Sequence, residues 1–167
     1  MAELSLTVSG LHRTLGPDPR HYVEVARLAE EVGFGQVVLA DHVLMGERTD
    51  RYPYGDFPFA PDEPWLEPLT MLAGVAAATT SIRLATGILV APLRGATLLA
   101  KTVATLDALS GGRVDLGVGV GWQREEFDAA GVPCARRWWG LEVSRGAWRA
   151  LGADGPATCG SAAVRVG

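Results

Sequence analysis

Short apolar runs alternate with amphipathic helical segments along most of the chain, and this alternation limits the fold more than any other feature. Apolar residues that follow strand or helix periodicity give the order β-α-β-α-β-α-β-α. Continuous apolar strands separated by helices are typical of a parallel sheet buried by its helices. The predicted strands are 4–9, 36–40, 82–89 and 113–118, and the predicted helices are 18–33, 67–79, 97–109, 123–130 and 138–151.

Two α/β architectures fit this order. One is a doubly wound open sheet, and the other is part of a (β/α)8 barrel. Both place ligands at the carboxyl ends of the strands, so the pattern alone does not separate them, but it does indicate where a site is expected.

The connection from Asp41 to Trp65 is much longer than the two to six residues usual in such folds. It is rich in proline and aromatic residues. One explanation is a loosely packed insertion. We favour a packed active-site loop or lid, because its apolar side chains need a surface to cover.

Two short motifs follow predicted strands. Asp41 and His42 close the second strand, at the location where catalytic residues are expected, and histidine exchanges protons near neutral pH. A lone histidine is, however, more often structural than catalytic. His12 and His21 are less promising candidates. The glycines of Gly117–Trp122 allow close backbone approach to a flat ligand, and tight strand packing is the alternative explanation. The motif is not a dinucleotide fingerprint, because Trp122 stands where the last glycine would be needed.

Composition and missing motifs exclude several classes of protein. The net charge of −4 and the scattered arginines argue against nucleic-acid binding. No apolar run approaches a membrane span, and the first ten residues lack a signal-peptide pattern, so we expect a cytoplasmic protein. Cys134 and Cys159 have no metal-site or disulfide-framework spacing, and no hydrolase or zinc motif is present. We therefore expect no bound metal and no nucleic-acid or membrane partner.

Four stretches of the chain resemble the luciferase-like monooxygenase family, and in particular its branch of oxidoreductases that use the deazaflavin coenzyme F420. The resemblance covers about residues 4–151, in the family's order and spacing, and it favours the barrel over the doubly wound sheet. The stretches are ARLAEEVGFGQVVLADHV (26–43), PWLEPLTMLAGVAAATTSIRLATGILVAPLR (64–94), LAKTVATLDALSGGRVDLGVGVGWQREEF (99–127) and GVP (131–133).

The resemblance implies a redox site at the strand ends. In the family a non-prolyl cis peptide supports one face of the coenzyme ring, and the matching bond is Gly87–Ile88. The residues implied as coenzyme-binding are Asp41, Thr86, Gly87, Ile88, Val120, Gly121 and Trp122, and the residue implied as catalytic is His42.

The implied reaction is hydride transfer between F420 and a small organic substrate, with His42 stabilising or protonating the developing charge. With FMN as the alternative coenzyme, the family chemistry would be oxygen activation. In a sugar-phosphate dehydrogenase branch an acidic proton donor occupies the position of Trp122, so the resemblance does not favour that substrate class.

A complete barrel of this type needs about 250 residues, whereas this chain supplies about four βα units, half of a (β/α)8 luciferase-like barrel. We expect residues 1–151 to form that half and residues 152–167 to be an irregular tail. Exposed strand edges and apolar side chains would favour a homodimer. The alternative to an oxidoreductase is a non-catalytic coenzyme-binding or structural half-barrel.

Overall fold

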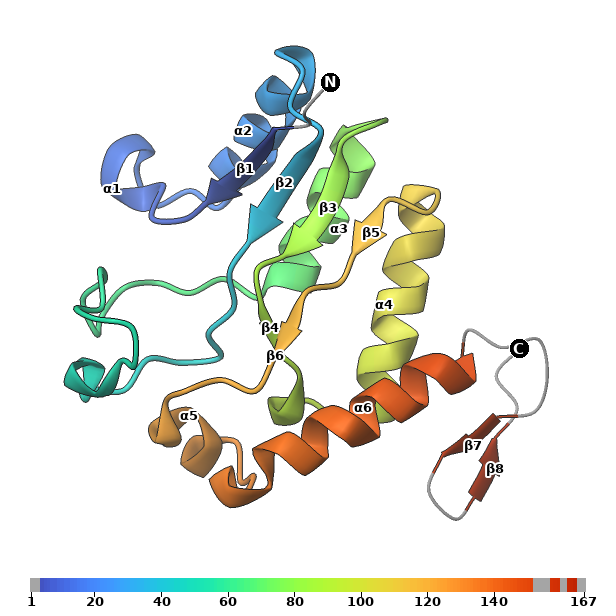
Figure 1. Cartoon of the computed structure of the whole chain (residues 1–167). Helices are drawn as coiled ribbons and strands as arrows, with labels where there is room; N and C mark the ends of the chain where they lie inside the picture. Colours follow the sequence, from blue (N-terminus) through green and yellow to red (C-terminus); the bar gives the residue numbers. More distant parts are fainter. Residues whose placement is uncertain (1–3, 152–156, 160–161, 165–167) are drawn as a thin grey trace.

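Four parallel strands form the centre of the molecule (Figure 1). A computed structural model describes residues 4–151, 157–159 and 162–164. The strands pair in the order β1-β2-β3-β5. Their bounds are β1 Ser5–Val8, β2 Gln36–Leu39, β3 Arg83–Thr86 and β5 Val114–Asp115.

This strand order decides between the two architectures. A doubly wound sheet reverses its strand order at a switch point, whereas a barrel adds each new strand beside the previous one. Here every strand follows its predecessor, and helices α2 (Arg20–Glu31), α3 (Pro68–Ala78) and α4 (Ala96–Ser110) lie on one face of the sheet (Figure 1). The half-barrel prediction is confirmed.

The core lies between the sheet and these helices. Val37 and Leu84 on the middle strands are fully buried against Leu72 and Val75 of α3 and Leu99 of α4. The opposite face is polar near the amino ends of the strands: the Ser5 hydroxyl donates to Gln36, whose amide donates to Asp115 at 2.8 Å. That part of the open face differs from the apolar surface expected from the sequence.

The third and fourth predicted strands are each divided in two. β4 (Leu89–Val90) follows β3 and pairs with β6 (Val118–Gly119), which follows β5. The peptide bond between Gly87 and Ile88 is cis, as the resemblance implied. The backbone packs very closely where the strands divide: an added Cβ at Gly117 would lie 2.2 Å from the Thr86 carbonyl oxygen.

The remaining elements are short helices, a long last helix and a ribbon. Helix α6 packs across α4 and the turn η2 (Figure 1). The elements are α1 His12–Leu15, η1 Thr49–Arg51, η2 Ala91–Leu93, α5 Arg124–Ala129, η3 Cys134–Arg136, α6 Arg137–Leu151, β7 Ala157–Cys159 and β8 Ala162–Val164.

β7 and β8 form an antiparallel ribbon within the segment that we expected to be irregular. That prediction is wrong for these six residues, because Ala157–Cys159 and Ala162–Val164 pair in register. The rest of the predicted tail lies outside the described residues.

A buried arginine joins helix α3 to the sheet. Arg113 donates hydrogen bonds of 2.7–3.1 Å to the backbone carbonyls of Ser110, Ile82, Ala76 and Thr79 and to the Thr79 hydroxyl. Since the carbonyls at the end of a helix carry partial negative charge, a guanidinium there is favourable even without a carboxylate partner.

Glu30 of α2 binds the backbone of the connection between α3 and β3. The Glu30 carboxylate accepts hydrogen bonds from the backbone N–H groups of Thr80, Ser81 and Ile82. Burial raises the pKa of Glu30, but these hydrogen bonds outweigh it and lower the pKa to about 2.

Candidate active site

Asp41 follows β2 and forms a buried ion pair that ties three segments together. Its carboxylate accepts hydrogen bonds from the Val90 N–H at 2.7 Å and from both terminal nitrogens of Arg94, at 2.6 and 2.9 Å. Arg94 also binds Glu67, which caps the amino end of α3. Burial lowers the pKa of Arg94, but the hydrogen bond and charge of Asp41 outweigh it, so the pKa is raised and the guanidinium stays cationic. Both carboxylate oxygens of Asp41 are therefore already engaged within the chain.

His42 is held in an aromatic cage. Its ring packs edge-on against Trp65, Phe57 and Trp122, with centroid distances of 4.5, 5.8 and 6.1 Å. Only 10% of the side chain is exposed. Its Nδ1 atom lies 3.1 Å from the carboxylate of Glu126 on α5, which is fully buried. The imidazole is thus fixed by apolar rings and faces a carboxylate on one side.

Most aromatic residues of the long connection pack on one another, whereas Tyr54 is exposed. Tyr52, Phe57, Phe59 and Trp65 make edge-to-face or tilted contacts, and Trp122 from the strand end joins them. Such contacts stabilise a loop beyond simple area burial. The predicted packed loop agrees with this arrangement, and its use as a lid remains a prediction.

Segment Thr86–Ile88 lies where β3 passes into β4. Thr86 is buried and its hydroxyl donates to the Gly117 carbonyl at 2.7 Å. Gly87 and Ile88 are exposed, and Ile88 is 40% accessible. An added Cβ at Gly87 would lie 2.6 Å from Val38, so only glycine fits against β2 here. This segment offers an exposed apolar surface at the strand ends.

The glycines after β5 have a packing explanation within the chain. A Cβ at Gly119 would lie 2.6 Å from Ile88 Cδ1, and one at Gly121, where φ is +69°, would lie 2.7 Å from Val90. The glycines therefore bring the two strand ends together. Val120 and Trp122 are half-buried beside them.

An open hollow of about 400 Å³ lies against the sheet next to these strand ends. Val38, Thr86 and Gly117 line its carboxyl-terminal part, and Gln36 and Asp115 line the rest. Of the predicted site residues, Thr86 lines the hollow, and Gly87 and Ile88 follow it directly in the chain.

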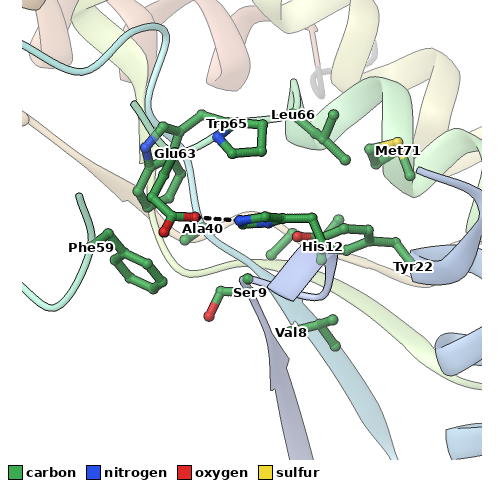
Figure 2. Close-up of a pocket in the computed structure, with 13 residues that line it drawn as sticks. Val8, Ser9, His12, Tyr22, Ala40, Phe59, Glu63, Trp65, Leu66 and Met71 are labelled. Atoms are coloured by element: carbon green, nitrogen blue, oxygen red, sulfur yellow. Dashed lines mark ion pairs between the residues drawn. The ribbon is translucent and has the colours of Figure 1, made fainter. Parts of the chain in front are cut away.

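A second, small pocket, with a cavity volume of about 30 Å³, opens between the ends of β1 and β2, helix α3 and the long connection (Figure 2). Inside it His12 Nε2 lies 2.6 Å from a carboxylate oxygen of Glu63, which Arg13 also binds. Trp65 separates this pocket from His42, because its indole contacts His42 and also lines the pocket. None of the residues predicted for the site lines this pocket.

Sequence reasoning therefore missed several residues of this region. His12 comes four residues after β1, the same kind of position that singled out His42 after β2, so a signal existed for it. Arg94, Gln123 and Glu126 carried no such signal, because their partners lie 53, 77 and 83 residues away in the chain.

Within the described part of the chain, no group of three His, Cys, Asp or Glu side chains is placed to hold a metal ion. Among the same residues, no helix has the length and apolar character needed to cross a membrane.

Fold and site together define a class: a (β/α)-barrel half in which a caged histidine, a buried ion pair and an exposed strand end gather at the carboxyl edge of the sheet. In essentially every characterised enzyme with such a barrel, this edge carries the active site.

The chain belongs to the luciferase-like monooxygenase family, whose family model matches residues 3–155. It is 38% identical over 130 residues to the uncharacterized protein Rv0953c of Mycobacterium tuberculosis, covering 75% of this chain and 46% of that protein. It is also 35% identical over 114 residues to the F420-dependent glucose-6-phosphate dehydrogenase of Amycolatopsis mediterranei, covering 68% of this chain and 31% of the relative.

Solved structures show the same fold. Monooxygenase RslO1 from Streptomyces bottropensis superposes with a TM-score of 0.72 at 24% identity, over 98% of this chain and 47% of that structure. The oxygenating constituent of 3,6-diketocamphane monooxygenase of Pseudomonas putida, solved in complex with FMN, gives 0.63 at 17% identity, over 85% of this chain and 39% of that structure. The chain spans less than half the length of these proteins.

Proposed function

We propose that this chain is part of an oxidoreductase that transfers hydride between coenzyme F420 and a small organic substrate, with FMN as the alternative coenzyme. The observation that carries the proposal is the placement of His42, nearly buried and fixed in its cage directly after β2, a strand that also lines the open hollow. Family membership and the F420-dependent relative support a coenzyme of this kind.

The residues at the strand ends fit a flat ring on two counts. Ile88 is exposed two residues after Thr86, which lines the hollow, and Gly87 keeps the chain close to β2, so an apolar surface is available for one face of a ring. Val120, Gly121 and Trp122 would border its edge. Asp41 would act indirectly, because its ion pair with Arg94 anchors the β4 backbone through Val90.

The coenzyme, when bound, supplies the hydride chemistry, or oxygen activation if it is FMN. The chain orients the reactants, excludes water with its aromatic loop, and uses His42 to exchange a proton with the reacting group. The packed aromatic side chains around His42 favour an apolar or planar substrate. Trp122 cannot donate a proton as a carboxyl group does, so a sugar phosphate is not part of the proposal.

Titration with F420 and with FMN, followed through protein tryptophan fluorescence, tests the proposal. We expect saturable binding in the micromolar range or tighter for one coenzyme, and turnover that His42→Ala abolishes without loss of coenzyme binding. If neither coenzyme binds, the proposed function is wrong.

A second candidate function is a non-catalytic coenzyme-binding or structural half-barrel. The structural form is favoured by the glycines at 117 and 119, since atoms of Thr86 and Ile88 already occupy the space that their missing side chains leave. Under this alternative no turnover is measured, whether or not a coenzyme binds.

A further inference from the structure

Glu126 is a completely buried carboxylate that faces the catalytic candidate His42. One of its oxygens, Oε1, accepts a hydrogen bond from the Val43 N–H at 2.8 Å. The other, Oε2, lies 3.1 Å from His42 Nδ1. The Glu126 side chain of α5 therefore contacts both the His42 imidazole and the backbone N–H of the next residue.

The two facing atoms have no alternative partners. In the part of the chain that the structure describes, His42 Nδ1 and Glu126 Oε2 are both buried polar atoms without an aligned hydrogen-bond partner. Buried polar groups are almost always paired, and each of these two has the other within hydrogen-bonding distance. At this separation Nδ1–H can donate to the carboxylate.

Further contacts hold the backbone that follows His42 against α5. The Gln123 side chain binds the Gly46 backbone in both directions, accepting from its N–H at 2.8 Å and donating to its carbonyl at 3.1 Å. A Cβ at Gly46 would lie 2.7 Å from the Cβ of Glu125, so the loop lies directly on α5. The segment that carries His42 is thus held to this helix at both Val43 and Gly46.

We propose that Glu126 is a positioning residue: it holds the proton of neutral His42 on Nδ1 and so directs Nε2 to the bound reactant. The hydrogen bond of one ring nitrogen determines the protonation of the other, which gives a buried carboxylate this control. The proposal rests on the proposed function, in which His42 exchanges a proton at that second nitrogen.

Glu126→Gln gives a sharp test because the replacement has nearly the same shape but only one acceptor oxygen. The buried Val43 N–H needs that oxygen, so the amide NH₂ group turns toward His42 Nδ1. An NH₂ group can only donate, so Nδ1 must accept and the proton of the neutral ring moves to Nε2. The substitution is expected to reverse the tautomer rather than to loosen the site.

The readout is the ¹⁵N NMR spectrum of the imidazole nitrogens in the full chain. The chain has three histidines, so His42→Ala assigns the His42 signals. We expect a protonated Nδ1 and an unprotonated Nε2 in the wild type, and the reverse in E126Q. The matched control is Asp128→Asn, which removes an exposed carboxylate from the same helix and should leave the wild-type tautomer.

Two outcomes would overturn the proposal: a wild-type His42 protonated on Nε2, or the same tautomer in wild type and E126Q. The wild-type measurement is decisive alone if E126Q does not fold. With turnover established, E126Q should lower kcat by about 10²-fold or more and leave coenzyme affinity unchanged. Since the NMR result needs no turnover, an inactive wild type would refute the proposed function and leave the tautomer result intact.

Discussion

Replacing Asp41 by alanine should destabilise the fold strongly, because its carboxylate connects the end of β2 to β4 and to Arg94. The substitution removes three hydrogen bonds and leaves the Val90 N–H buried without an acceptor. An unsatisfied buried donor costs about 1–3 kcal/mol, and breaking a buried ion pair costs about 3–5 kcal/mol. Arg94 keeps Glu67 as a second partner at 3.1 Å, which lowers the second figure. We therefore expect a net loss of about 3 kcal/mol in the free energy of unfolding.

Urea denaturation followed by tryptophan fluorescence measures this loss. The matched control is Asp50→Ala, which breaks an exposed pair with Arg48 and should leave the unfolding midpoint unchanged. A double-mutant cycle of Asp41→Ala with Arg94→Ala should give a coupling energy of about 1–3 kcal/mol. A loss below about 1 kcal/mol in Asp41→Ala would refute the interpretation of Asp41 as an anchor.

Four further predictions follow from the same contacts. Arg113→Met should lower the free energy of unfolding by about 3 kcal/mol, since it leaves carbonyls at the end of α3 without donors; denaturant unfolding measures this, and an unchanged midpoint would contradict it. Gly117→Ala should cost about 1–3 kcal/mol or more, because its Cβ would collide with the Thr86 carbonyl; a neutral effect in the same assay would show that the strands can separate freely. Glu30→Gln should be less stable than the wild type above pH 4.5, and the difference should disappear as the pH falls toward 2. The reason is that the carboxylate, whose pKa is lowered in the folded state, stabilises the fold only while it is ionised. Equal stability of the two proteins at neutral pH would disprove this. The chain should sediment as a dimer, since the described sheet leaves β1 and β5 with unpaired edges, whereas a stable, well-dispersed monomer would count against that prediction.

Much of the fold could be predicted from periodicity. Apolar runs located the strands and helices, because buried strands such as Gln36–Leu39 and amphipathic helices such as Arg20–Glu31 show their burial in local sequence. The division of the third and fourth strands could not be seen in this way. It depends on the contact between Thr86 and Gly117, which are 31 residues apart.

Only the candidate site residues that stand at the end of a predicted strand could be predicted from the sequence. His42 and Asp41 stand directly after a strand, which is where barrel enzymes carry polar residues. Glu126 lies on the short helix α5, and Gln123 directly precedes this helix. They are buried because the loop from Val43 to Gly46 folds onto them, and such long-range contacts have no local signature.

The proposed binding site for a flat coenzyme at the strand ends can be tested by NMR. The chain has two isoleucines, Ile82 and Ile88, whose methyl groups can be labelled selectively. Ile88 is 40% exposed at the strand end, and Ile82 is 1% exposed in the core, so it serves as an internal control. Saturation with F420 or FMN should shift the Ile88 methyl resonance through the ring current and leave that of Ile82 in place. An unmoved Ile88 resonance at saturation would mean that the ring does not bind at these strand ends.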